Sequence, residues 1–278
     1  MSARNSRANK AAARERLRQE RELQAKRDKR RRQLTVGLVG LGVLALTGGI
    51  GYAVVQANKP AHWEAARNQS LVKPANTSGE NGTTIVIGKK DAEKTLEIYE
   101  DARCPVCAGF EQAVGDELHK DVKEGKYKLQ FVGATFLDGD DLSEDRVGAY
   151  GEGSKNTLSA LGAALDVSTD AFLDYKAALY SAEFHPEESD DKFKDDAYLI
   201  KVADTVDALK DNKEFRKNVE DGTFDRWALE MSKKFAESGV SGTPTLKMGG
   251  DKLTAEGTDN PPMTVAQFRA AVDKALAK

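Results

Sequence analysis

The sequence predicts an α/β fold in which a small β-sheet is interrupted by a long helical block. Three observations support this fold class. β-prone runs surround a helical pattern between residues 83 and 131, and amphipathic helical patterns fill the region of about 140–239. A strand, a tight turn and a final amphipathic helix follow in residues 245–278. Because strand character resumes only after the helices, the block is predicted to be an insertion into one sheet.

The opening of this body is predicted to be β-β-α-β. Residues 83–87 and 94–100 are short runs with strand character. Four apolar residues at spacings of 3, 4 and 4 then predict a helix: Cys107, Phe110, Val114 and Leu118. Large apolar residues that alternate with other side chains predict a third strand: Tyr127, Leu129 and Phe131.

The insertion is predicted from apolar stripes at helical spacing. These stripes span residues 158–165, 172–179, 199–209 and 224–235. Ser168 is a plausible N-cap for the second helix, and Gly239 can terminate the last one. A strand at 245–248, a turn at 249–251 and a short strand near Leu253 come next. Thr264 and Gln267 have capping-box spacing before the final helix.

Charge is distributed unevenly along the 278 residues. Residues 1–33 carry 13 Lys/Arg and 4 acidic residues, whereas the rest carries 29 basic and 41 acidic residues. The acidic body would repel phosphates, so a nucleic-acid partner is not expected.

Residues 34–55 contain no charged side chain and are long enough to cross a bilayer. The preceding Lys/Arg residues favour retention of residues 1–33 in the cytoplasm. We therefore predict a basic cytoplasmic tail, a transmembrane signal-anchor at 34–55, a flexible linker at 56–82 and a catalytic domain at 83–278 on the extracytoplasmic side of the plasma membrane. A signal peptide cleaved after Ala57 is the alternative, and it delivers the body to the same compartment.

Cys104 and Cys107 are the only cysteines and form a C-x-x-C motif where a predicted strand meets a predicted helix. Pro105 suits the first helical turn, because proline has no N–H to lose there. The free N–H groups and the helix dipole stabilise a thiolate on Cys104, the predicted nucleophile, whereas the more buried Cys107 is predicted to resolve the mixed disulfide.

Two alternatives for the cysteine pair are weaker. A metal site needs about four ligands, and the pair supplies two. The histidines have no ligand-like spacing to it: His62, His119 and His185. A structural disulfide across so short a loop stabilises the fold little. We therefore expect a redox pair, with no metal and no cofactor.

A second feature lies far along the chain. Thr243 and Pro244 directly precede a predicted strand, where a missing proline N–H is tolerated. A cis bond between them would leave the Thr243 backbone free to pair with an extended substrate. An ordinary turn proline is the alternative.

The segments LEIYEDARCPVCAGFEQ and GVSGTPTL, with the helical insertion between them, resemble the bacterial DsbA-like family of thiol–disulfide oxidoreductases over residues 83–278. The resemblance implies a thioredoxin-like fold with a redox centre at Cys104 and Cys107. It also implies that Pro105 and Val106 tune this centre, and that Thr243–Pro244 is a cis-proline loop that binds substrate.

The resemblance implies oxidation of cysteine pairs in exported proteins, and re-oxidation by a quinone-linked membrane partner. Two departures from the family pattern predict a mild oxidant. Ile98 stands where many relatives have a proton-transferring acid, with Glu97 and Glu100 nearby but offset. Val106 stands where the best-known oxidase has His. A reductase or isomerase for one client and a non-catalytic binding module remain alternatives.

Overall fold

The computed structural model describes residues 62–139 and 151–278. The predicted cytoplasmic tail and the predicted membrane span at 34–55 lie outside these residues. Within them, no helix combines the length and the apolar character that a membrane crossing requires.

Within the described residues, five strands form one mixed sheet in the order β1-β3-β2-β4-β5. They are β1 Ile85–Ile87, β2 Thr95–Asp101, β3 Lys128–Ala134, β4 Thr245–Met248 and β5 Asp251–Lys252. β2 and β3 pair in parallel, and the other pairs are antiparallel. The central strand β2 therefore lies between β3 and β4. The carboxyl end of β2 leads to the two cysteines.

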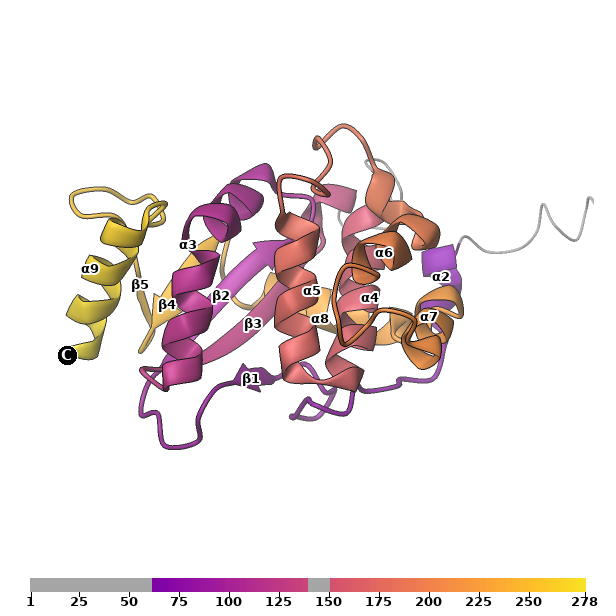
Figure 1. Cartoon of the computed structure of the whole chain (residues 1–278), viewed down its shortest axis with the longest axis horizontal. Helices are drawn as coiled ribbons and strands as arrows, with labels where there is room; N and C mark the ends of the chain where they lie inside the picture. Colours follow the sequence, from indigo (N-terminus) through magenta and orange to yellow (C-terminus); the bar gives the residue numbers. More distant parts are fainter. Residues whose placement is uncertain (1–61, 140–150) are drawn as a thin grey trace, which may run out of the picture. The chain divides into compact units, whose positions relative to one another are not determined.

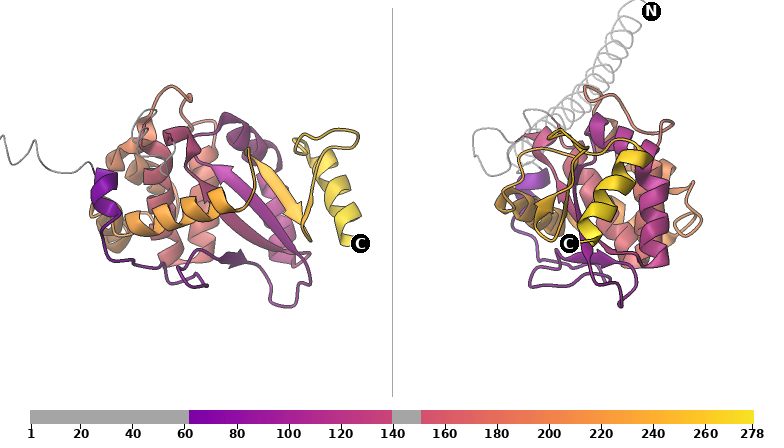
Figure 2. Two further views of the ribbon diagram at one scale, coloured as in Figure 1. Left: turned by 180° about the vertical axis from the view of Figure 1, so that it is seen from behind. Right: turned by 90° about the vertical axis from the view of Figure 1, so that its left-hand side faces the viewer.

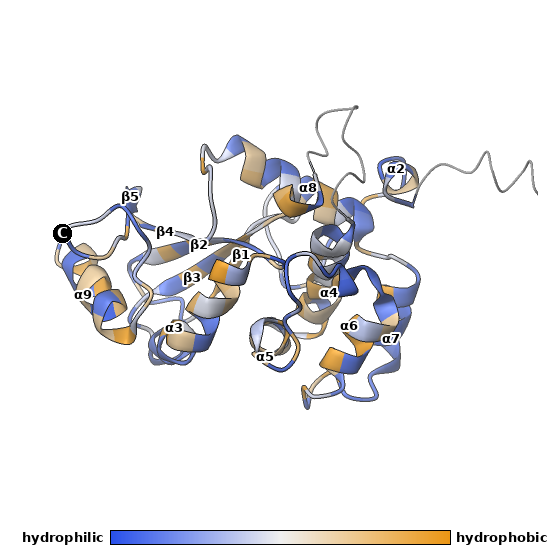
Figure 3. Ribbon diagram, turned by 90° about the horizontal axis from the view of Figure 1, so that it is seen from above, coloured by the Kyte–Doolittle hydropathy of each residue, from blue (hydrophilic) through white to orange (hydrophobic). Residues whose placement is uncertain are grey.

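Helices cover both faces of the sheet (Figures 1 and 2). They are α2 His62–Ala66, α3 Pro105–Glu124, α4 Gly153–Val167, α5 Thr169–Tyr180, α6 Asp196–Ala203, α7 Lys213–Glu220, α8 Asp225–Glu237 and α9 Val265–Leu276, with short 3-10 turns at Phe136–Asp138 and Lys192–Lys194. Figure 3 looks along the layers, with α3 and α5 on one side of the sheet and α8 on the other.

The core forms where apolar faces of the helices meet the sheet. Strand alternation places Leu96 and Ile98 of β2 on one face, and both are fully buried. The rings of Phe131 on β3 and Phe172 on α5 meet edge to face, with centroids 5.2 Å apart. These contacts bury the sheet face beneath α3 and α5.

The helical block is built around α4. Gly162 lets α4 approach α8 closely, because a Cβ atom at this position would lie 2.9 Å from the Trp227 ring. Ser168 caps α5 as predicted, since its hydroxyl accepts a hydrogen bond from the N–H of Ala171. The α/β fold with its helices between β3 and β4 agrees with the predicted fold class.

Three local predictions need correction. The helix predicted at 199–209 ends at Ala203, because the chain turns there while Val206 and Leu209 stay buried and so continue the apolar spacing. Helix α7 was not predicted. The predicted flexible linker 56–82 is too long: Trp63 is 3% exposed in the core, and Trp227 Nε1 donates to Gly82 O at 2.7 Å.

Candidate active site

The cysteine pair begins helix α3 directly after strand β2. Cys104 is the N-cap in an extended conformation, and Pro105 occupies the first helical turn. The N–H of Cys104 donates to Asp101 O at 3.0 Å, which fixes the turn between strand and helix. The predicted strand-to-helix placement of the motif is therefore present in the structure.

The two thiols are free and differ in accessibility. Cys104 is 7% exposed, and Cys107 is fully buried. They pack with Ala108 and Tyr180 in a small apolar cluster that also contacts Leu137. Pro105 and Val106 are exposed, so they lie on the surface that a partner protein meets. Only Cys104 is placed to react first with a bulky substrate.

Hydrogen bonds make Cys104 acidic. Hydrogen bonding by the Cys107 thiol, by the Thr243 side chain and by the backbone N–H groups at Cys107 and Val106 lowers the pKa of Cys104 to about 6, against the opposing effect of burial. Burial raises the pKa of Cys107, and its hydrogen bond to Cys104 raises that pKa further. The pair therefore separates into a thiolate at Cys104 and a neutral thiol at Cys107.

Thr243 and Pro244 lie against Cys104. Their peptide bond is cis, as predicted, and the Cys104 thiol donates to Thr243 O at 3.6 Å. Pro244 is buried at the start of β4, which pairs with β2. The sheet thus brings together two segments that lie 139 residues apart in the sequence.

A buried cluster of charges lies behind the cysteines. Lys176 Nζ on α5 lies 2.9 Å from Glu100 Oε2 and 2.7 Å from Glu111 Oε2. All three side chains are at most 3% exposed. Burial raises the pKa of Glu100 to about 7, and the charges of Glu111 and Cys104 act in the same direction. Glu100 in turn raises the pKa of Cys107, so the carboxylate and the thiol influence one another.

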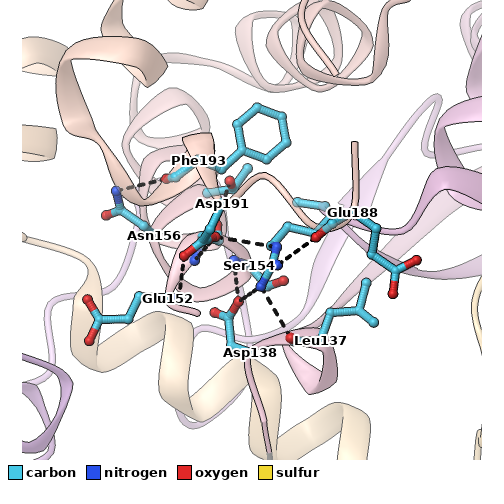
Figure 4. Close-up of polar contacts among 12 residues, drawn as sticks. Leu137, Asp138, Glu152, Ser154, Asn156, Glu188, Asp191 and Phe193 are labelled. Atoms are coloured by element: carbon cyan, nitrogen blue, oxygen red, sulfur yellow. Dashed lines mark hydrogen bonds and ion pairs between the residues drawn. The ribbon is translucent and has the colours of Figure 1, made fainter. Parts of the chain in front are cut away.

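Arg103 anchors the loop that carries Cys104. Its guanidinium donates to Asp138 Oδ1 at 2.8 Å and to Glu188 O at 2.9 Å, and it lies 3.4 Å from Asp191. Figure 4 shows these acceptors together with Ser154, whose N–H donates to Asp138 at 3.0 Å. The helical block thereby holds the active-site turn through a network centred on the buried pair of Arg103 and Asp138.

Comparison with known proteins identifies the family. A family model described as Thioredoxin matches residues 80–274. This chain belongs to the thioredoxin family. Among the solved structures similar to this thioredoxin-family chain is oxidised Mtb DsbA, with 22% identity and a TM-score of 0.53 over 70% of this chain and 93% of that one.

Two further solved structures have the same fold. BdbD from Bacillus subtilis is 20% identical, with a TM-score of 0.55 over 74% of this chain and 100% of that one. MdbA, a thiol–disulfide oxidoreductase from Actinomyces oris, is 20% identical, with a TM-score of 0.53 over 73% of this chain and 92% of that one. The predicted thioredoxin-like fold is confirmed, and the solved structures that share it include a DsbA protein and a thiol–disulfide oxidoreductase.

One known protein is similar in sequence to part of this thioredoxin-family chain. The serine/threonine-protein kinase PknE of Mycobacterium tuberculosis is 23% identical over 161 residues, which is 58% of this chain. The chain covers only 27% of the length of that kinase. The likeness therefore concerns a portion of the kinase.

The sequence patterns did not identify Glu100 as a residue of the site in this thioredoxin-family chain. Ile98, at the family's usual acidic position, is buried in the core. Because side chains alternate along a strand, Glu100 lies on the same sheet face as Ile98 and two residues nearer Cys104. Glu97 is on the other face, where it accepts a hydrogen bond from Tyr99. The alternation of side chains along the strand could have identified Glu100, rather than Glu97, as the glutamate that shares a sheet face with Ile98.

The low pKa of Cys104 predicts how the reactivity of this thiol toward an alkylating reagent depends on pH. Since the pKa of Cys104 is lowered to about 6, its thiolate predominates above that pH and is lost as the pH falls through it. The rate of alkylation of the reduced protein by iodoacetamide, with the modified cysteine identified by mass spectrometry, is expected to rise with a midpoint near pH 6. A midpoint near that of a free cysteine, about 8.5, would contradict this assignment.

Proposed function

We propose that this DsbA-like oxidoreductase is anchored in the plasma membrane and oxidises cysteine pairs in exported proteins. The observation that carries the proposal is the acidic Cys104 at a helix start, directly beside the cis Thr243–Pro244 bond. Cys104, the more exposed of the two thiols, can react with a cysteine of an unfolded chain, with Thr243 positioned to pair with the backbone of that chain.

The proposed reaction begins with Cys104 and Cys107 joined as a disulfide. A substrate thiolate attacks Cys104 Sγ, the bond to Cys107 breaks, and a mixed disulfide forms while Cys107 leaves and takes up a proton. A second substrate thiolate then attacks the substrate sulfur of this mixed disulfide. The substrate gains a disulfide, and Cys104 leaves as a thiolate, so two electrons have passed to the enzyme. Its low pKa makes Cys104 a good leaving group.

Glu100 is the proposed proton carrier for Cys107. The pKa of Glu100, raised by burial to about 7, lets this carboxyl hold or release a proton near neutral pH. Glu100 can thus supply the proton that Cys107 needs as it leaves, and accept that proton when the pair is re-oxidised. Lys176 holds the carboxylate in place at 2.9 Å.

The proposed location depends on residues outside the described ranges. The uncharged run at 34–55 and the basic residues before it support a single-pass anchor with the catalytic domain on the extracytoplasmic side. Re-oxidation of the dithiol requires an oxidant, and a quinone-linked membrane protein is the proposed partner. The exported proteins in that compartment are the proposed substrates.

The decisive test is the reduction potential of the full chain in detergent, with its rates on a reduced peptide and on a disulfide peptide. The pKa of Cys104, about 6, lies between the values of about 7 for thioredoxin and about 3.5 for DsbA. We expect a potential between about −270 mV and about −120 mV, with faster oxidation than reduction. A potential near −270 mV, about that of thioredoxin, with reduction dominant would contradict the oxidase and indicate a reductase.

A further inference from the structure

A surface pocket adjoins the cysteine pair on the side of the helical block. Its volume is about 600 Å³. The pocket is lined by Arg103, Phe136, Leu137, Glu187, Glu188 and Ser189. Arg103 directly precedes Cys104, and Leu137 packs against the cluster that contains both cysteines. A polypeptide whose cysteine reacts with Cys104 therefore passes within reach of this pocket.

The floor of the pocket is apolar. Phe136 is 44% exposed, an unusual degree for a large aromatic side chain. Its ring stacks on that of Phe235, with centroids 6.1 Å apart and planes inclined by 20°. This stacking holds the Phe136 ring in a fixed orientation beside Leu137. The floor can therefore receive an aliphatic chain without reordering the aromatic pair.

The rim of the pocket is acidic. Glu187 and Glu188 are exposed, and among the described residues no basic side chain forms an ion pair with either carboxylate. Among the described residues of the lining, Arg103 is the one cation, and it is already engaged by two carboxylates, Asp138 and Asp191. The charge that the pocket presents to a ligand is thus negative.

We propose that this pocket selects substrates with a Lys or Arg side chain close to the cysteine that reacts with Cys104. The inference rests on the proposed function and specifies its substrate class. A basic side chain fits both parts of the site, because its methylene stem can lie over Phe136 and Leu137 while its charged head reaches Glu187 and Glu188. The exposed ring face of Phe136 adds a cation–π contribution. An acidic side chain at the same place is repelled.

The test compares reduced two-cysteine peptides that differ only in the residue beside the first cysteine: Arg, Glu or Gln. We expect the full chain in detergent to oxidise the Arg peptide with a kcat/KM about tenfold above that of the Glu peptide at low salt. The double variant Glu187→Gln/Glu188→Gln is expected to reduce this ratio to about twofold or less. The matched double variant Glu220→Gln/Glu256→Gln, which alters two exposed glutamates outside the pocket, is expected to keep the tenfold ratio.

Salt provides a second measurement on the unaltered chain. Because rim charges are screened, the Arg/Glu ratio is expected to fall several-fold between about 0.05 M and 0.5 M NaCl. Equal rates for the Arg and Glu peptides, or an equal loss of preference in both double variants, would overturn the pocket assignment. Failure to oxidise any of the three peptides would instead overturn the proposed function.

Discussion

Replacement of Lys176 by Met is expected to lower the free energy of unfolding by about 3–5 kcal/mol at pH 7. Lys176 is 1% exposed and lies between Glu100 and Glu111, so its removal leaves two buried carboxylates without their cation. Burial opposes the charge of Lys176, but these two carboxylates hold its pKa above the ordinary value. His119, 3.4 Å from Glu111, is the one remaining ion-pair partner of these carboxylates among the described residues.

The pH dependence of the Lys176→Met effect has a definite sign. The pKa of Glu100 is already raised from 4.5 to about 7, and loss of the cation raises it further. A carboxyl whose pKa is higher in the folded state favours folding below its unfolded pKa and loses that contribution as the pH rises. The destabilisation is therefore expected to be small below about pH 4.5 and to grow as the pH rises through 7.

Urea unfolding of the variant at several pH values measures this prediction. Lys192→Met is the matched control, because Lys192 is exposed and pairs with the exposed Asp190 at 2.9 Å. Its effect is expected to be far smaller, because solvent screens an exposed pair. Adding Glu100→Gln and Glu111→Gln to Lys176→Met should restore most of the lost stability, since no buried charge then remains unpaired. A loss that is independent of pH, or no recovery in the triple variant, would contradict the electrostatic explanation.

The features that could be predicted from the sequence are those written in local patterns. A short run with strand character predicted β2, and the spacing of apolar residues together with Pro105 predicted the start of α3. The strand β4 after Pro244 was predicted at its observed bounds. Helix α7 was missed because only Phe215 and Val219 are buried in an otherwise polar segment, which leaves too short an apolar stripe to recognise.

The features that could not be predicted are pairings between distant segments. The period of two along β2 indicates which face Glu100 occupies, but nothing local identifies Lys176 as its partner. Arg103 likewise looks like a solvated charge beside the motif, and its burial depends on Asp138 and Asp191 from the helical block. Such contacts are set by tertiary packing, so the chemistry of the pair could be predicted while its electrostatic surroundings could not.

The cysteine variants are expected to give the largest effects on activity. Cys104→Ser should reduce exchange to the uncatalysed rate, because Cys107 is fully buried and burial holds the pKa of its thiol high. Cys107→Ser should instead trap substrate. In that variant the Cys104 thiolate attacks a disulfide peptide, a mixed disulfide forms and one peptide thiolate leaves. The serine hydroxyl cannot resolve this complex, so it accumulates.

Non-reducing electrophoresis and mass spectrometry after reaction with the disulfide peptide measure both outcomes. We expect a covalent complex through Cys104 in Cys107→Ser and none in Cys104→Ser or in the double serine variant. Val106→Ala alters an exposed side chain in the same turn. Combined with Cys107→Ser, it tests whether a disturbance of the turn is by itself enough to prevent trapping. A complex that forms through Cys107 would reverse the assigned roles, because it would require the buried thiol to be the one that substrates reach.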